Sequence, residues 1–385
     1  MTTKANEIEE DKKKKNLEII KKIIKENEYE YIDEIGYGGF GVVSEVEKDG
    51  KHFAMKIVMN PNNNEQLKTE LVNEFRGKNI VKIILEKKII KEGKEQKEGE
   101  QSYYLYIMER SNIGDLNNFN KFLYTYLYTY LIFKEPFIEK VGDNLIRFLA
   151  QQLAIALKTL YLGNLVHFDI KPSNILIFKD LTLKLIDFSL LRKVNKENNE
   201  KIPEGTFGFC TPESYSDKEF NIEDLRKQDY YAIGMTIYFL KYEKSEVENY
   251  KREKQGASTD KNLDLNITTR AIEDAFENIQ SKEYQDKDFT EFLCNLIKFK
   301  PEDRLNFEQI IRNKWLNKNK KEIKKINNIN ESNENNLILE LQKSDFLINN
   351  RKYYRKNFNE RYGNENDNKK YKKIKKGKFK FGKKN

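Results

Sequence analysis

Alternating and continuous apolar runs in the first third of the chain predict β-strands. They cover residues 31–34, 41–47, 52–59, 81–90 and 103–109. Asp49-Gly50 lies between two of these runs, and an Asp-Gly pair flanked by β-type residues favours a hairpin. Lys91–Gln101 is charged and contains glycine, so it predicts a loop before the last strand.

Helical periodicity replaces this pattern further along the chain. Apolar residues recur at helical spacing over residues 65–75, 145–162, 228–240, 268–279, 288–298 and 307–316. Strands followed by helices predict an α+β fold with two lobes. We expect a small antiparallel β-rich lobe with one main helix at about 31–110, and a larger, mostly α-helical lobe at about 111–316.

The two ends of the chain differ from this central domain. Residues 1–30 form a charged N-terminal extension, in which Asn6–Asn27 has the pattern of an exposed helix with one apolar edge. Residues 317–385 are rich in Lys and Asn and are expected to be largely disordered. Within them, Leu337–Ile348 has the spacing of a short amphipathic helix.

Positive charge is concentrated at the C-terminal end. The 385 residues contain 71 Lys and Arg against 62 Asp and Glu, a net charge of +9. From Lys318 to Asn385 there are 21 basic and 8 acidic residues, with Tyr371, Phe379 and Phe381 among the lysines. Such a tail suits an anionic partner, either a nucleic acid or an acidic membrane. A solvated tail that only confers solubility is the alternative.

Several protein classes are disfavoured by what the sequence lacks. Two cysteines and two histidines argue against a disulfide framework and a multi-histidine metal centre. Met1–Lys15 is polar and highly charged, unlike a signal peptide. The nearest approach to a membrane span, Phe119–Phe133, is short and carries Lys121, so it predicts a buried or half-buried helix. We therefore expect an intracellular protein, in the cytoplasm or the nucleus.

Glycines cluster in the segment Gly36-Tyr37-Gly38-Gly39-Phe40-Gly41-Val42-Val43. A dinucleotide-binding fold would need a helix after this pattern, whereas here Val42–Glu47 continues as a strand. The glycines therefore belong to a strand–turn–strand flap, whose backbone N–H groups can approach phosphate oxygens closely. An ordinary glycine hairpin is the alternative.

Lys56 lies in the apolar run Phe53-Ala54-Met55-Lys56. Burying an unpaired ammonium is costly, so a lysine in such a run needs a partner. Strand alternation places Ala54 and Lys56 on one face, where Ala54 leaves room for a flat ring and Lys56 can pair with phosphates. A lysine at a strand edge is the alternative.

Two later segments carry the polar groups that phosphoryl transfer needs. They are His167-Phe168-Asp169-Ile170-Lys171-Pro172-Ser173-Asn174 and Asp187-Phe188-Ser189. Asp169 can accept a hydroxyl proton and Lys171 supplies positive charge, while Asn174 and Asp187 offer oxygens to Mg²⁺. A polar loop that caps a helix and an acidic turn residue are the respective alternatives.

In order and spacing, these segments resemble the eukaryotic protein kinase family over about Tyr31–Leu316. Gly205–Glu213 is similar to the end of the family's activation segment, and Asp229–Gly234 to the start of its central helix. The resemblance implies that the arginine of Pro301–Arg304 pairs with Glu213. Lys171 together with Thr206 resembles the serine/threonine branch.

The resemblance also implies the roles of individual residues. Asp169 would align and deprotonate a substrate hydroxyl, Lys171 would stabilise the transferring phosphoryl group, and Lys56 would orient the ATP phosphates. Asn174 and Asp187 would hold Mg²⁺. The other nucleotide-binding residues would be Ile35, Gly36, Tyr37, Gly38, Gly39, Phe40, Gly41, Val43, Ala54, Met108, Glu109, Ser111 and Leu176.

The expected function is therefore that of a serine/threonine kinase that uses ATP and Mg²⁺ on a protein substrate. One alternative is a pseudokinase scaffold that binds ATP without efficient transfer. Another is a protein that binds nucleic acid or anionic lipid through its basic tail.

Some positions depart from the family pattern. Phe168 replaces the arginine that normally receives an activation-loop phosphate, and residues 190–205 contain no Ser, Thr or Tyr. We therefore expect activity without phosphorylation of that loop. Ser189 replaces a glycine, which would cost about 1 kcal/mol at a positive φ. Thr211 stands where the family usually has alanine.

The glutamate expected to pair with Lys56 is ambiguous. Counting back from Asn79 without gaps reaches Lys68, which is not an acid. A small shift in the loop Arg76-Gly77-Lys78 would bring Glu70 into place, so we favour Glu70 over Glu65. Catalysis would be impaired if neither carboxylate reached Lys56.

Overall fold

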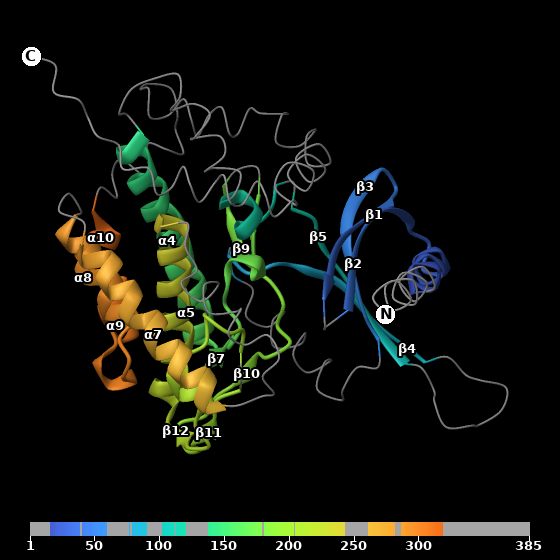
Figure 1. The fold of residues 1–385 in the computed structure, drawn as a ribbon. Coiled ribbons are helices and arrows are strands. Elements are labelled where there is room, and N and C mark those ends of the chain that lie inside the picture. Colours follow the sequence, from blue (N-terminus) through green and yellow to red (C-terminus); the bar gives the residue numbers. More distant parts are fainter. Residues whose placement is uncertain are drawn as a thin grey trace, which may run out of the picture. The chain divides into compact units, whose positions relative to one another are not determined.

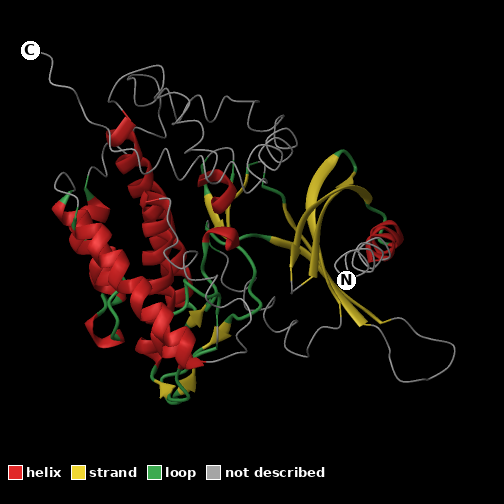
Figure 2. Ribbon diagram, viewed as in Figure 1, coloured by secondary structure: helices red, strands yellow, loops and turns green. Residues whose placement is uncertain are grey.

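The computed structural model describes most of the central domain and the helix before it. The described residues are 16–38, 41–59, 77, 79–90, 102–111, 113–120, 138–178, 181–203, 205–242, 261–281 and 286–318. Strands dominate the N-terminal part and helices the rest (Figures 1 and 2). This order confirms the predicted α+β fold.

A five-stranded antiparallel sheet forms from the N-terminal part. Its strands, in spatial order, are β1 (Glu30–Gly38), β2 (Gly41–Lys48), β3 (Lys51–Met59), β5 (Ser102–Glu109) and β4 (Ile83–Ile90). Asp49 and Gly50 join β2 to β3 with positive φ angles of 53° and 70°, as a tight two-residue hairpin turn requires. The glycine flap is also a hairpin, because β1 pairs with β2 as far as Gly38 opposite Gly41.

A helix over residues 16–26 packs against the sheet. Ile20, Ile23 and Ile24 are at most 4% exposed. They share a hydrophobic core with residues of β2, β3 and β5, including Met55 and Leu105. The apolar edge of this helix is therefore part of the core of the sheet.

The later part of the chain is built on four long helices among the described residues. They are α4 (Ile138–Leu162), α5 (Ile222–Tyr242), α7 (Lys261–Gln280) and α8 (Lys287–Leu296). α5 contacts both α4 and α8, and most of its residues are buried. Leu145–Leu162 is long and apolar enough to cross a membrane. Most of this segment is buried within the protein, however, as in a core helix.

Short strands support the loops between these helices. β6 (Gly114–Asp115), β8 (Ile175–Ile177) and β9 (Leu183–Leu185) form one sheet; β7 (Leu165–Val166) pairs with β10 (Arg192–Lys193), and β11 (Glu200–Lys201) with β12 (Glu219–Phe220). Leu185 donates to the carbonyl of Asn79 at 2.9 Å, and Val81 donates to the carbonyl of Leu185 at 3.0 Å. These bonds tie β9 to the residues that lead into β4.

The predicted helix over residues 307–316 is wrong as a single element. The chain forms two short helices instead, α9 (Phe307–Ile311) and α10 (Lys314–Asn317). The Asn313 side chain accepts a hydrogen bond from the N–H of Trp315 and so caps α10. Such a bond competes with continued helix formation, which explains the break.

The predicted strands are confirmed. The long helices begin up to seven residues earlier than the sequence pattern indicates. Several predictions lie outside the described residues. These are the loop at 91–101, the helices at 65–75 and 337–348, most of 119–133, and the basic tail.

Candidate active site

A carboxylate from α5 organises the loop that follows α4. Asp229 accepts hydrogen bonds from the backbone N–H groups of His167 at 2.8 Å and Phe168 at 3.0 Å. Burial raises the pKa of Asp229 to about 7, although the two N–H donors act in the opposite direction. Phe168 has a φ of +64°, which is rare for an aromatic residue. Asp229 therefore holds the loop in a conformation that presents the next residue, Asp169.

Asp169 lies at the centre of a polar cluster. Its carboxylate accepts hydrogen bonds from Lys171 Nζ and Asn174 Nδ2, both at 2.8 Å, and from Thr206 Oγ1 at 2.6 Å. Lys171 also donates to Thr206 Oγ1. These donors fix the orientation of a carboxylate that is only 4% exposed. Such a group suits the acceptance of a proton from a bound hydroxyl.

Lys56 and Asp187 meet although 131 residues separate them in the chain. Lys56 Nζ, on β3, donates to Asp187 Oδ1 at 2.8 Å, and each side chain is 17% exposed. Burial by itself raises the pKa of Asp187, but the Lys56 ammonium, with smaller effects of His167 and Lys171, holds that pKa below its usual range. Lys56 lies in an apolar strand and therefore needs an anionic partner, and this partner is Asp187.

The neutral imidazole of His167 connects the loop of Asp169 to the loop of Asp187. Its Nδ1 accepts a hydrogen bond from the N–H of Asp169 at 3.3 Å, so its Nε2 donates to the carbonyl of Ile186 at 3.0 Å. Burial lowers the pKa of His167. Its ring also packs on Phe188, with centroids 5.4 Å apart. The His167 side chain therefore contacts Asp169 and both neighbours of Asp187.

The residues expected around an adenine share one face of the sheet. Ala54 is opposite Met108 of β5, and Val43 is opposite Lys56. Residues paired across strands project to the same side, so these four line the face that carries Lys56. Leu176 lies in β8, half-buried.

The glycine flap is described only in part. Ile35 and Gly36 lie in β1, where Gly36 pairs with Val43. Gly41 has a φ of +122°, and a Cβ there would lie 2.2 Å from the carbonyl oxygen of Ile57. Close strand packing therefore already requires glycine at position 41. Gly39 and Phe40 lie outside the described residues, as does the side-chain position of Tyr37.

Asn174 and Asp187 fit the expected role of magnesium ligands. Asn174 Nδ2 is engaged by the carbonyl and carboxylate of Asp169, so its amide oxygen is the atom suited to a metal. Magnesium takes one or two carboxylates and completes its shell with waters and substrate phosphates. Among the described residues, no group of three or more His, Cys, Asp or Glu could hold a metal by itself. A nucleotide would have to supply the remaining ligands.

The predicted pairing of Glu213 with Arg304 is confirmed. Arg304 Nη2 donates to Glu213 Oε2 at 2.9 Å, and Nη1 donates to Oε1. Both side chains are buried. Thr211 is buried too and donates to Gln228 on α5. These bonds anchor the segment that ends at Glu213 onto the helical core.

A family model for the protein kinase domain matches residues 29–316. The chain belongs to the protein kinase family. The sheet of the N-terminal lobe and the helices of the C-terminal lobe are those of the bilobal kinase fold, as the sequence pattern predicts.

Individual relatives are distant and match in part. An Aurora kinase of Eremothecium gossypii is 26% identical over 46% of this chain and 44% of its own length. An interferon-induced, double-stranded RNA-activated protein kinase of Rattus norvegicus is 23% identical over 77% and 53%. A probable serine/threonine-protein kinase nek2 of Dictyostelium discoideum is 26% identical over 55% and 48%. The chain spans about half the length of these curated relatives.

Two expected hinge residues of the kinase domain use their side chains elsewhere. Glu109 pairs with Lys184 of β9, and Ser111 donates to the carbonyl of Ile177. A nucleotide in the expected position would therefore meet the backbone of these residues.

The expected strain at Ser189 is wrong. Among the described residues with positive φ, Asp187 appears with +62° and Ser189 does not. Serine therefore carries no left-handed backbone penalty at this position. Glu65 and Glu70 lie outside the described residues, so the glutamate that pairs with Lys56 stays a prediction.

Asp229 and His167 are functional residues to which the sequence pattern assigned no role. The signal for Asp229 is an acid directly before the long apolar run of α5 that begins at Tyr230. A buried acid needs hydrogen-bond donors, and the donors are the loop amides described above.

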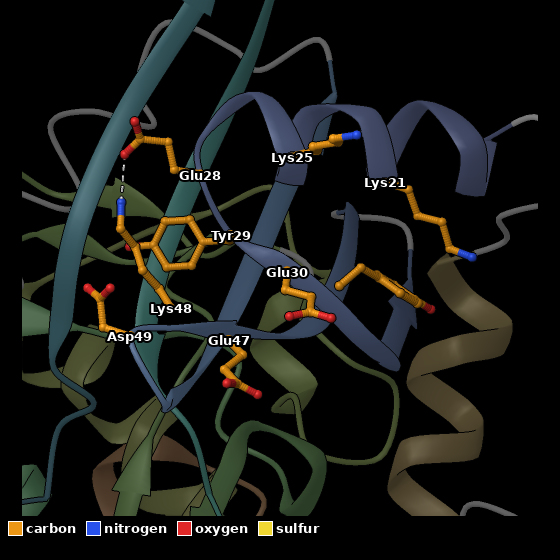
Figure 3. Close-up of a pocket in the computed structure, with 9 residues that line it drawn as sticks. Lys21, Lys25, Glu28, Tyr29, Glu30, Glu47, Lys48 and Asp49 are labelled. Atoms are coloured by element: carbon orange, nitrogen blue, oxygen red, sulfur yellow. Dashed lines mark hydrogen bonds and ion pairs between the residues drawn. The ribbon is translucent and has the colours of Figure 1, made fainter.

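An open groove of about 850 Å³ lies apart from this site, beside the helix over residues 16–26 (Figure 3). None of the residues expected in catalysis lines it. Lys48 crosses it to pair with Glu28 at 2.9 Å. Both lysines and acids line it, and we assign it no ligand.

Proposed function

We propose that this chain is a serine/threonine protein kinase that transfers the γ-phosphoryl group of Mg-ATP to a protein hydroxyl. The observation that carries the proposal is the Asp169 carboxylate, held by Lys171, Asn174 and Thr206. The Lys56–Asp187 pair supports it, because it places a phosphate-binding cation beside a metal ligand.

Asp169, Lys171 and Lys56 have different roles in the proposed transfer. Mg-ATP supplies the phosphoryl group when bound. Asp169 orients the attacking hydroxyl and accepts its proton as the new oxygen–phosphorus bond forms. The bond from the γ-phosphorus to the bridging oxygen breaks at the same time, and ADP leaves. Lys171 offsets the negative charge of the moving group, and Lys56 holds the phosphates that leave. Positioning and electrostatic stabilisation supply most of the rate in such a reaction.

The test is incorporation of labelled phosphate into a generic basic protein by wild type and by Asp169→Asn. We expect the substitution to reduce the rate at least about 100-fold, with nucleotide affinity and thermal stability near wild type. Equal incorporation would exclude the proposal. Nucleotide binding without any transfer by wild type would instead support the alternative of an ATP-binding pseudokinase scaffold.

We also propose that activity does not depend on phosphorylation of the activation loop. Phe168, which replaces the usual arginine, is buried at 7% exposure in a hydrophobic cluster. Val194 and Ile202 of the loop join the same cluster. Arg192 of the loop lies 5.8 Å from the Phe168 ring centroid. Apolar burial thus supplies a tether for the loop where relatives of the family would use a phosphate.

Phosphatase treatment tests this second proposal. We expect wild-type activity to survive complete dephosphorylation, and Ile202→Ala to lower activity without any change in phosphorylation. Ile202→Val, which keeps most of the apolar contact at that position, serves as the matched control. A phosphate on Ser189, Thr206 or Thr211 that proves essential would refute the idea. Thr206 and Thr211 already use their hydroxyls in hydrogen bonds, partly buried for Thr206 and buried for Thr211.

The anionic partner of the basic tail and the intracellular location, in cytoplasm or nucleus, remain predictions from the sequence. A salt-dependent affinity for RNA or acidic vesicles that vanishes when residues 369–385 are deleted would support the anionic partner.

A further inference from the structure

Arg226 of α5 is a buried arginine whose side chain is 5% exposed. Its Nη2 donates to Asn164 Oδ1 at 2.7 Å, and its Nη1 donates to Glu223 Oε1 at 2.5 Å. Its guanidinium carbon lies 4.2 Å from the ring centroid of Tyr161. A buried guanidinium needs hydrogen-bond acceptors, and the acceptor on Asn164 is 62 residues away in the chain. The bond is therefore a tertiary contact, which joins α5 to the turn after α4.

Asn164 forms the turn between α4 and β7. Its φ of +53° lies in the left-handed region, which asparagine tolerates better than most residues do. Its N–H donates to the carbonyl of Tyr161 at 3.2 Å. The Asn164 turn thus sets the direction in which the chain leaves α4 toward Asp169.

The backbone of Asn164 also holds the activation loop. The N–H of Val194 donates to the carbonyl of Asn164 at 2.8 Å. This bond continues the ladder between β7 and β10, in which Lys193 lies opposite Leu165. Val194 is only 3% exposed, in the same hydrophobic cluster as Phe168. Asn164 is therefore bonded to α5 through its side chain and to the activation loop through its carbonyl.

Arg226 and Asp229 lie three positions apart on α5 and so lie on the same face of the helix. Asp229 binds the two backbone N–H groups that immediately precede Asp169. Arg226 binds Asn164, at the other end of the same short segment. The helix α5 therefore holds this segment at two points, one after α4 and one beside Asp169.

We propose that Arg226 is a positioning residue that holds the Asn164 turn and, through it, both the Asp169 loop and the activation loop. The inference rests on the proposed function, because phosphoryl transfer is its first readout. The family's arginine at the position of Phe168 would join the two loops through a phosphate. The connection through Arg226 and Asn164 needs no phosphate.

Steady-state kinetics of phosphoryl transfer by the full chain test the role of the Asn164 side chain. Asn164→Gly removes the acceptor for Arg226 but permits the left-handed backbone and keeps the carbonyl that binds Val194. A hydrogen bond to a charged group is lost, so we expect kcat to fall roughly 10-fold. The KM for ATP should stay near wild type, because the sheet that carries Lys56 is unchanged. Asn164→Asp keeps an acceptor oxygen and should retain most of the activity.

Replacing Arg226 by Leu tests the same bond from its other end. Arg226→Leu should also lower kcat roughly 10-fold, and the double variant with Asn164→Gly should be no slower than Arg226→Leu alone. Arg312→Met is the matched control, because it removes an arginine from an exposed ion pair with Glu308, and it should leave kcat unchanged. Wild-type kcat in Asn164→Gly, or additive losses in the double variant, would overturn the inference. If Arg226→Leu folded poorly, the contrast between Asn164→Gly and Asn164→Asp would decide by itself.

Hydrogen exchange of residues 190–196 provides a measurement that does not depend on activity. We expect exchange about tenfold faster in Asn164→Gly than in wild type, Asn164→Asp and Arg312→Met. If wild type transferred no phosphate, the proposed function would fail, and this measurement alone would decide whether the bond between Arg226 and Asn164 holds the activation loop. Exchange at the wild-type rate in Asn164→Gly would refute the inference.

Discussion

Lys56 and Asp187 form an ion pair with a hydrogen bond of 2.8 Å. The pair joins β3 of the sheet to the loop after β9. It therefore holds a cation suited to phosphates beside a carboxylate suited to a metal.

Replacing Lys56 by Met should reverse the shift of the Asp187 pKa. In wild type that pKa lies below 3.8, so the pair stabilises the fold at neutral pH and the contribution is lost as pH falls through the lowered pKa. In Lys56→Met burial remains without the cation, so the pKa rises above 3.8. The burial penalty then appears as pH rises through the new pKa. Thermal unfolding of both proteins from about pH 3 to about pH 7 should show opposite slopes for this group. Identical slopes of stability against pH in the two proteins would contradict the idea that Lys56 lowers the Asp187 pKa.

Replacing Thr206 by Ala should lower kcat by roughly 10- to 100-fold with little change in KM for ATP. The substitution removes a hydrogen bond to the Asp169 carboxylate and one from Lys171, and charged hydrogen bonds contribute about 1.5–3 kcal/mol. Thr206→Ser keeps the hydroxyl and should retain most of the activity. Steady-state kinetics of the three proteins make the comparison, and equal losses in both variants would argue against the hydroxyl.

Arg304→Met should destabilise the protein by about 3–5 kcal/mol, because it leaves the buried Glu213 carboxylate without its cation. Lys318→Met breaks an exposed pair with Asp286 and should cost less than about 1 kcal/mol. Denaturant unfolding gives both values. Similar costs for the two substitutions would show that burial does not govern the Glu213 pair.

Gly234→Ala should cost about 1–3 kcal/mol through overpacking. A Cβ at position 234 of α5 would lie 2.7 Å from Ile297 Cγ2 and 2.8 Å from Leu296 Cβ. Ile297→Ala removes the first of these atoms, so the double variant should lose less than the sum of the two single costs. Strict additivity in unfolding measurements would show that the helix interface relaxes freely.

Short-range patterns predicted the fold and much of the site. Strand alternation placed Ala54 and Lys56 on one face, and the Asp-Gly pair located a hairpin turn. The pairing of Glu213 with Arg304 followed from the family resemblance. These features depend on local geometry or on fixed motifs, both of which are visible in one sequence.

Long-range side-chain pairing was not predictable in the same way. Nothing local to Glu109 or Lys184 indicates that their side chains meet, because the contact exists only after β5 and β9 come together. Likewise the left-handed backbone falls on Asp187 and not on Ser189. The position of positive φ is set by the hydrogen bonds of the surrounding loop, not by residue type alone.

The helix over residues 16–26 has a practical consequence for anyone who prepares this protein. The family match begins at residue 29, so a fragment trimmed to that boundary would lose Ile20, Ile23 and Ile24. Burial of three such side chains contributes roughly 5–9 kcal/mol, comparable to the whole stability of many domains. The bared patch on Val46 and Met55 would favour aggregation in expression trials. Fragments for assays should therefore start before Asn16.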